Sequence, residues 1–299
     1  MNLPPELRAA VEVVERACAH AQPPQHLHNR LDFLRAEEEE RLLGRDRAAL
    51  GPEDIFVWID EAPNEMPVAE VAWFLPRHIA LIAEGEHCAG VLNWPYALTA
   101  LKRSGFPERW PEDAVDAVIG FAAALMRDYA RDPGRLGPVL DSELPRGFEA
   151  LLAFAVGGNL PLGPVLAGLD DVAPPQRARL IARWSVESVG PERTAYGGIG
   201  FEAMADFLVA SAFLHPEAAC VTKSWLVLQE PWVIIPRALE GETEPEWQDV
   251  LDEAATLWMA AARDGREGRA VSPWRSRSRY LRRYRQKRRR RSGPAPTTG

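Results

Sequence analysis

The residues best suited to chemistry with another molecule lie near the C-terminal end, where arginines alternate with aromatic side chains. Arginine binds phosphate oxygens through paired hydrogen bonds, and aromatic rings stack on exposed nucleic-acid bases. Between 269 and 299 the chain has eleven arginines, Lys287 and no acidic residue, a charge of +12. The candidate nucleic-acid-binding residues are Arg275, Arg277, Arg279, Tyr280, Arg282, Arg283, Tyr284, Arg285, Lys287, Arg288, Arg289, Arg290 and Arg291. This pattern predicts RNA or DNA as the partner of the C-terminal segment.

The rest of the chain has the opposite charge. The whole sequence carries −8, so the 268 residues before the C-terminal segment carry −20. A segment of +12 can therefore also dock on the acidic body, or on an acidic surface of another protein. A third alternative is that the segment has no specific role, because a GC-rich genome raises arginine content everywhere, and this chain has 32 arginines against 3 lysines.

A second group of polar residues, between 78 and 88, is compatible with an enzyme. His78, Glu86 and His87 could serve as acid–base groups in a pocket among the central helices. Together with Cys88 they could also bind a metal, but their spacing matches no standard metal site, and Cys88 also fits a small buried residue. We therefore predict no metal and no other cofactor, and an enzyme stays the alternative to a binding protein.

Two loops carry further groups that could bind a ligand. Gly198 and Gly200 precede a predicted helix, whose first N–H groups could hold an anion, but no apolar strand comes before them. The acidic pairs Asp170–Asp171 and Asp141 with Glu143 are typical of surface loops beside prolines. No standard catalytic motif occurs in the chain, so the sequence identifies no reaction.

The elements that must position these residues are mainly helices. Apolar residues recur with a 3.6-residue period, so that Val118, Leu125, Leu251 and Trp258 are expected to be buried. Helices are predicted over residues 5–21, 27–44, 111–131, 175–188, 201–212 and 245–263.

Proline divides the chain into short segments. A Pro-Glu pair favours a helix start, because proline needs no N–H partner there and glutamate complements the helix dipole. Such pairs begin at Pro5, Pro52, Pro107, Pro111, Pro191, Pro216 and Pro245. Their spacing is irregular, which excludes a regular solenoid.

Four apolar stretches are harder to interpret. Residues 55–59, 78–82 and 232–235 fit either buried strands or pieces of helix. Residues 150–169 carry no charge but include two prolines and four glycines, which favours two short buried helices over a membrane span. The predicted fold class is mainly α, irregular and punctuated by proline, with a few short strands within 55–82 as an alternative.

Three regions are expected along the chain. Residues 1–50 form an N-terminal helical segment that packs on the body, 51–265 form a mainly helical acidic body, and 266–299 form a disordered Arg-rich tail. Three widely separated cysteines and an N-terminus without a secretory signal predict a cytoplasmic protein. We expect a binding or adaptor protein whose body makes protein contacts and whose tail engages nucleic acid.

Overall fold

All regular structure in the described part of the chain is helical. The computed structural model of the 299-residue protein describes residues 3–28, 35–60, 65–85, 97–134, 147–188, 214 and 216–266. The α-helices there are α1 (Pro5–Ala17), α2 (Ala36–Leu43), α3 (Pro52–Asp60), α4 (Val68–Glu84), α5 (Thr99–Arg103), α6 (Glu112–Arg131), α8 (Gly147–Gly157), α9 (Leu162–Ala167), α10 (Pro174–Ser188), α12 (Pro216–Leu228), α13 (Pro231–Gly241) and α14 (Pro245–Arg266). Two 3₁₀-helices, η1 (Arg47–Ala49) and η3 (Gly168–Asp171), complete them, and the described residues contain no strand. The mainly α prediction is confirmed.

Most Pro-Glu pairs in the described residues start a helix. The prolines at 5, 52, 216 and 245 are first residues of helices, and Pro111 is the N-cap of α6. Pro107 is the exception, because it lies in the turn between α5 and α6. A helix that began at Pro107 would need an N–H group four residues later, where Pro111 has none. Pro191 lies outside the described residues.

The stretches that allowed a strand are helical. Residues 55–59 lie in α3, 78–82 lie in α4 and 232–235 lie in α13, so the strand alternative is wrong for all three. Helix α4 is buried over most of its surface, which removes the polar face that would have shown a helical period. Residues 150–169 form α8 and α9 joined by a turn, as predicted. No helix in the described ranges has the length and apolar character that a membrane crossing requires.

The segment before α2 differs from the prediction of one helix over 27–44. Helix α2 begins only at Ala36, and the chain is not helical at Leu27 and His28. Two carboxylates hold this segment instead: Glu39 accepts from the Leu27 backbone N–H at 2.6 Å. Glu70, buried in α4, accepts from the His28 backbone N–H at 3.1 Å and lies 2.8 Å from its ring Nδ1. Helix α1 likewise ends at Ala17, earlier than the predicted 21.

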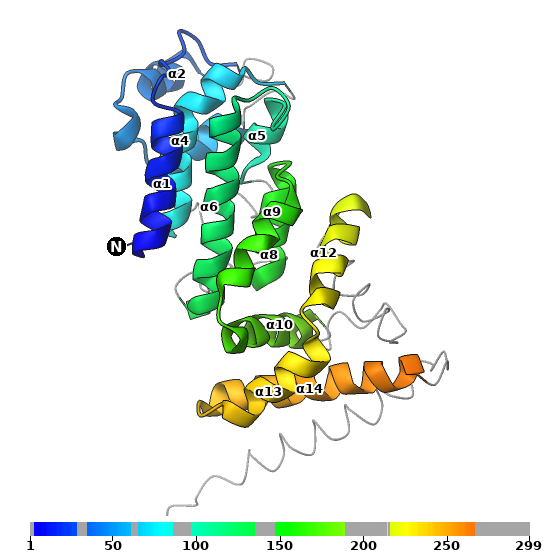
Figure 1. The fold of residues 1–299 in the computed structure, drawn as a ribbon. Coiled ribbons are helices and arrows are strands. Elements are labelled where there is room, and N and C mark those ends of the chain that lie inside the picture. The colour runs from blue at the N-terminus through cyan, green and yellow to red at the C-terminus, as the bar shows by residue number, and fades with distance from the viewer. Residues whose placement is uncertain are drawn as a thin grey trace, which may run out of the picture.

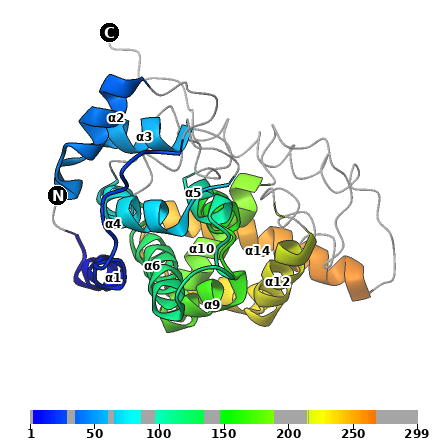
Figure 2. The same ribbon diagram turned by 90° about the horizontal axis from the view of Figure 1, so that it is seen from above.

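The helices pack in two groups. Helices α1, α6, α9 and α12 stand side by side in a row, and α4 packs against α1 (Figures 1 and 2). Helices α10, α13 and α14 form a layer that runs across the lower end of this row (Figure 1). The predicted core positions are confirmed, because Val118 and Leu125 of α6 and Leu251 and Trp258 of α14 have no exposed surface.

Arg179 links α10 to the segment between α13 and α14 in the lower layer. Arg179 of α10 donates from Nε and Nη2 to the two carboxylate oxygens of Glu242 at 2.7 and 2.6 Å, and from Nη2 to Glu244 at 2.9 Å. Its guanidinium also lies 5.1 Å from the ring centroid of Trp247. Burial by itself would raise the pKa of Glu242, but hydrogen bonds from the Glu244 backbone, from Arg179 and from the Thr243 backbone outweigh it and lower the pKa below its usual 4.5.

This lowered pKa predicts a pH-dependent contribution to stability. A carboxyl group whose pKa is lower in the folded protein stabilises the fold above its unfolded pKa, and this contribution disappears as the pH falls through the folded pKa. Glu242→Gln is therefore expected to lower the free energy of unfolding by about 1–2 kcal/mol at pH 7. The difference from the wild type should close as the pH falls below 4.5, measured by urea unfolding at several pH values. A difference that stays constant down to pH 3 would contradict the ion pair.

Candidate functional site

The sequence-predicted sites fall mostly outside the part of the chain that the structure describes. This holds for the Arg-rich segment, for Glu86 and His87, and for the glycines near 198. His78 is described, and it is buried within α4 and lines neither pocket considered below. Because only one of the three enzyme candidates lies among the described residues, that alternative stays a prediction. Over the described ranges, no three His, Cys, Asp or Glu side chains gather closely enough to hold a metal ion.

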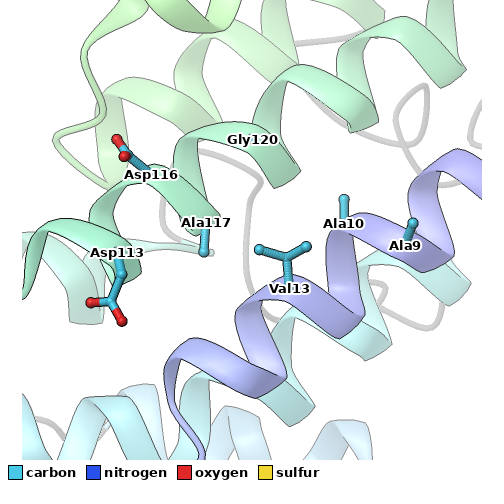
Figure 3. Close-up of a pocket in the computed structure, with 7 residues that line it drawn as sticks. All are labelled: Ala9, Ala10, Val13, Asp113, Asp116, Ala117 and Gly120. Atoms are coloured by element: carbon cyan, nitrogen blue, oxygen red, sulfur yellow. The ribbon is translucent and has the colours of Figure 1, made fainter.

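A shallow groove of about 500 Å³ runs between α1 and α6. Its lining residues are Ala9, Ala10, Val13, Asp113, Asp116, Ala117 and Gly120. Val13 and Ala117 point into the gap between the helices, whereas Asp116 points away from α1 (Figure 3). Asp113 accepts a hydrogen bond from the Ala114 backbone at 2.9 Å. The groove is thus a close approach of two helices with small side chains, and no reactive groups converge in it.

A second pocket, of about 440 Å³, lies where α12 meets the layer of α10 and α13. We call it the α10–α12–α13 pocket. Its lining residues are Asp170, Pro174, Arg177, Trp225, Leu228, Gln229, Glu230 and Ile234. They come from η3, the first turn of α10, the end of α12 and the start of α13. The pocket therefore exists only because four elements meet.

The turn between α12 and α13 shapes one wall of this pocket. The backbone N–H of Gln229 closes α12 by donating to the carbonyl oxygens of Trp225 and Leu226, both at 3.2 Å. Glu230 then adopts a left-handed conformation with φ of 48°, which non-glycine residues adopt at a cost. Pro231 follows as the first residue of α13, where its fixed φ is already helical.

Arg177 is the polar centre of the α10–α12–α13 pocket. Its Nη1 donates to Asp170 Oδ1 at 3.3 Å and to Gln229 Oε1 at 3.1 Å. Its Nε and the indole Nε1 of Trp225 are both buried, and neither has a hydrogen-bond acceptor among the residues that the structure describes. The residues that line the pocket thus include two with a buried N–H donor that lacks a partner, and two carboxylates, Asp170 and Glu230, against one guanidinium.

Sequence reasoning found one member of this pocket and missed the others. Asp170 belongs to an acidic pair for which the sequence predicts a place in a surface loop. Arg177, Trp225 and Glu230 lie up to 60 positions away in the chain, and each looks ordinary within its own helix. No spacing rule links them, because their proximity depends on how α12 docks.

The buried carboxylates elsewhere in the described chain have partners of their own. Asp54 accepts from the Gly51 backbone at 2.9 Å and pairs with Arg41 and Arg45 at 3.1 and 3.0 Å. Glu149 accepts from the Ser188 hydroxyl at 2.6 Å. Asp54 thus links α3 to α2, and Glu149 links α8 to α10.

The buried thiol of Cys18 is not a candidate nucleophile. Burial raises the pKa of the Cys18 thiol to about 11, so this thiol stays protonated at neutral pH and is a poor nucleophile.

Comparison with known proteins does not assign a role to either pocket. No protein-family model, curated protein or solved structure matches the chain. The charge distribution of the sequence and the geometry of the described residues are the remaining indications of function.

Proposed function

We propose that this protein binds nucleic acid through its Arg-rich segment, residues 269–299, while its acidic helical body makes protein contacts in the cytoplasm. The observation that carries the proposal is the separation of charge, +12 on the last 31 residues against −20 on the other 268. Nucleic acid is a dense line of phosphates, and neutralising them with arginine releases condensed counterions, which drives binding. The aromatic residues among the arginines add surfaces on which unpaired bases can stack.

The ion pairs of the described body support the proposal that the Arg-rich segment, and not the body, binds nucleic acid. Several of its arginines are engaged by carboxylates of the body itself: Arg127 and Arg131 pair with Glu6, and Arg179 pairs with Glu242. Paired arginines offer little attraction to phosphate, and the net negative charge of the body repels it. The Arg-rich segment contains no acidic residue that could neutralise it in the same way. It is therefore the part of the chain best suited to an anionic partner.

The experiment that tests the proposal separates base stacking from charge attraction. Replacing Tyr280 and Tyr284 by alanine is expected to weaken binding to single-stranded RNA and DNA by about 1–3 kcal/mol for each stacked base. Binding to duplex DNA is expected to change much less, because its bases are already stacked. Fluorescence anisotropy with labelled single-stranded and duplex oligonucleotides at low salt measures both affinities.

A matched control keeps an aromatic ring at both positions and removes only the hydroxyl groups. The variant with phenylalanine at positions 280 and 284 should retain single-stranded binding, since the stacking face is unchanged. If the wild-type protein binds neither RNA nor DNA at low salt, the proposal is wrong. Docking on an acidic protein surface would then be the better explanation, and removal of the segment should change the stability or the oligomeric state of the protein.

A further inference from the structure

The α10–α12–α13 pocket combines features that normally cost a folded protein stability. Its two unpartnered N–H donors, Arg177 Nε and Trp225 Nε1, are closed off from solvent. Each such buried donor lowers the stability of the fold, and native proteins keep few of them. In addition, Glu230 holds a left-handed backbone conformation and Leu228 leaves 78% of its surface exposed. Costs of this kind collect at sites that are completed by another molecule.

Trp225 differs from four of the other five buried tryptophans that the structure describes. It is 7% exposed, and its ring lies 6.0 Å from that of Phe148. Four other buried tryptophans donate their indole N–H to a side chain at 2.9–3.3 Å. These pairs are Trp58 with Glu70, Trp110 with Ser104, Trp184 with Glu149 and Trp258 with Ser185. The indole of Trp225 lacks such an acceptor among the described residues. An oxygen atom of a ligand in the pocket would supply the missing acceptor for this N–H group.

The lining of the pocket defines the class of ligand. Both unmatched groups are donors, so the ligand must supply an acceptor oxygen. Asp170 and Glu230 outnumber the single guanidinium of Arg177, which disfavours a carboxylate or a phosphate and favours a neutral carbonyl. The same carboxylates can accept from N–H groups of the ligand. Leu228 and Ile234 offer apolar surface, and about 440 Å³ is within the usual range of small-ligand sites.

We propose that the α10–α12–α13 pocket binds a neutral peptide-like amide. Its carbonyl oxygen accepts from Trp225 Nε1–H and Arg177 Nε–H, its amide N–H groups face Asp170 or Glu230, and an apolar side chain covers Leu228. This site is independent of the nucleic-acid proposal.

The ligand reaches the two donors through movement of a side chain. Arg177 is held by contacts of 3.3 Å to Asp170 and 3.1 Å to Gln229, and Gln229 Nε2 lies 3.5 Å from Asp170 Oδ1, at the limit of a hydrogen bond. A side-chain rotation of this kind is common when a ligand binds and leaves the backbone in place. We take the Arg177 side chain, whose Nη1 makes both of its contacts, as the part of the wall that opens.

The test uses the indole N–H signals of full-length protein labelled with ¹⁵N-tryptophan. Trp225→Phe identifies the Trp225 signal, since that signal disappears from the spectrum. N-acetyl-leucinamide is titrated as the neutral amide, and N-acetyl-leucine, which differs by carrying a carboxylate, is the matched control ligand. We expect the amide to move the Trp225 proton signal downfield in a saturable way, as a new hydrogen bond does, while the Trp184 signal stays in place.

Two variants test the role of the arginine. Arg177→Lys keeps the charge but removes the Nε–H donor, so amide affinity is expected to fall about tenfold. Arg237→Lys makes the same change on the exposed side of α13 and should leave the affinity unchanged. An Arg177→Lys protein that binds the amide as tightly as the wild type would overturn the assignment of this donor.

Three further outcomes would overturn the proposal. The first is a Trp225 signal that does not respond to amide up to about 10 mM. The second is a stronger response to N-acetyl-leucine than to its amide, which would contradict the ligand class. The third comes from thermal unfolding without ligand: Trp225→Phe should leave the midpoint near that of the wild type, whereas Trp184→Phe, which strips a donor from buried Glu149, should lower it. Equal losses in both variants would show that the Trp225 N–H is already satisfied within the protein.

Discussion

Raising the salt concentration from about 50 to about 200 mM is expected to weaken binding of the full-length protein to duplex DNA by roughly 10³- to 10⁵-fold. The reason is that about six to ten phosphate contacts release a comparable number of condensed counterions, and dissolved salt opposes that release. The Arg-rich segment carries twelve positive charges, enough to make this number of contacts. The slope of the logarithm of affinity against the logarithm of salt concentration measures how many are made.

A protein that ends at Gly268 is the control for this experiment. It should lack the salt-dependent binding and should unfold at the same temperature as the full-length protein, because the removed segment has few apolar residues to bury. If the truncated protein keeps the affinity and the salt slope of the full chain, the contacts to phosphate come from the helical body. That result would contradict the proposed function.

Trp258→Ala is expected to lower the free energy of unfolding by about 3–5 kcal/mol. Trp258 is fully buried on α14, and its indole N–H donates to the Ser185 hydroxyl at 2.9 Å, so the substitution leaves both a cavity and an unmatched acceptor between α14 and α10. Urea unfolding followed by far-ultraviolet circular dichroism measures the loss.

The neighbouring residue provides a matched control. Met259 is half exposed on the same turn of α14, so Met259→Ala should change the free energy of unfolding by no more than about 0.5 kcal/mol. Comparable losses in the two variants would mean that α14 is held by its helical propensity and that its packing against α10 matters little.

The sequence alone was sufficient to predict the amphipathic helices and the faces they bury. Helices α6 and α14 each carry one apolar stripe at a 3.6-residue period, and Val118, Leu125, Leu251 and Trp258 are buried as predicted. Pro-Glu pairs also located most helix starts. The unpaired N–H groups and the dipole at a helix start depend only on neighbouring residues, so the pairs can be recognised without the rest of the fold. Where a pattern depends on one helix and its solvent, no knowledge of the rest of the fold is needed.

The charge separation is also a property of the sequence alone. The net charges of +12 and −20 follow from composition and hold whatever the fold. They are the basis of the proposed function, and the Arg-rich segment lies outside the described residues. Charge and aromatic content are therefore the basis of the nucleic-acid proposal, and a binding experiment tests it.

Only the tertiary structure decided the features that arise where elements meet. Helix α4 could not be told from a strand, because a helix buried over most of its surface shows no period. The chain at Leu27 and His28 is not helical, and its N–H groups are bound by Glu39 and Glu70, 12 and 42 positions further along the chain. The α10–α12–α13 pocket has the same origin, since whether Trp225 finds an acceptor depends on what α10 and α13 place beside it. Hydrogen bonds between distant residues are fixed by packing, and packing leaves no spacing pattern in a single sequence.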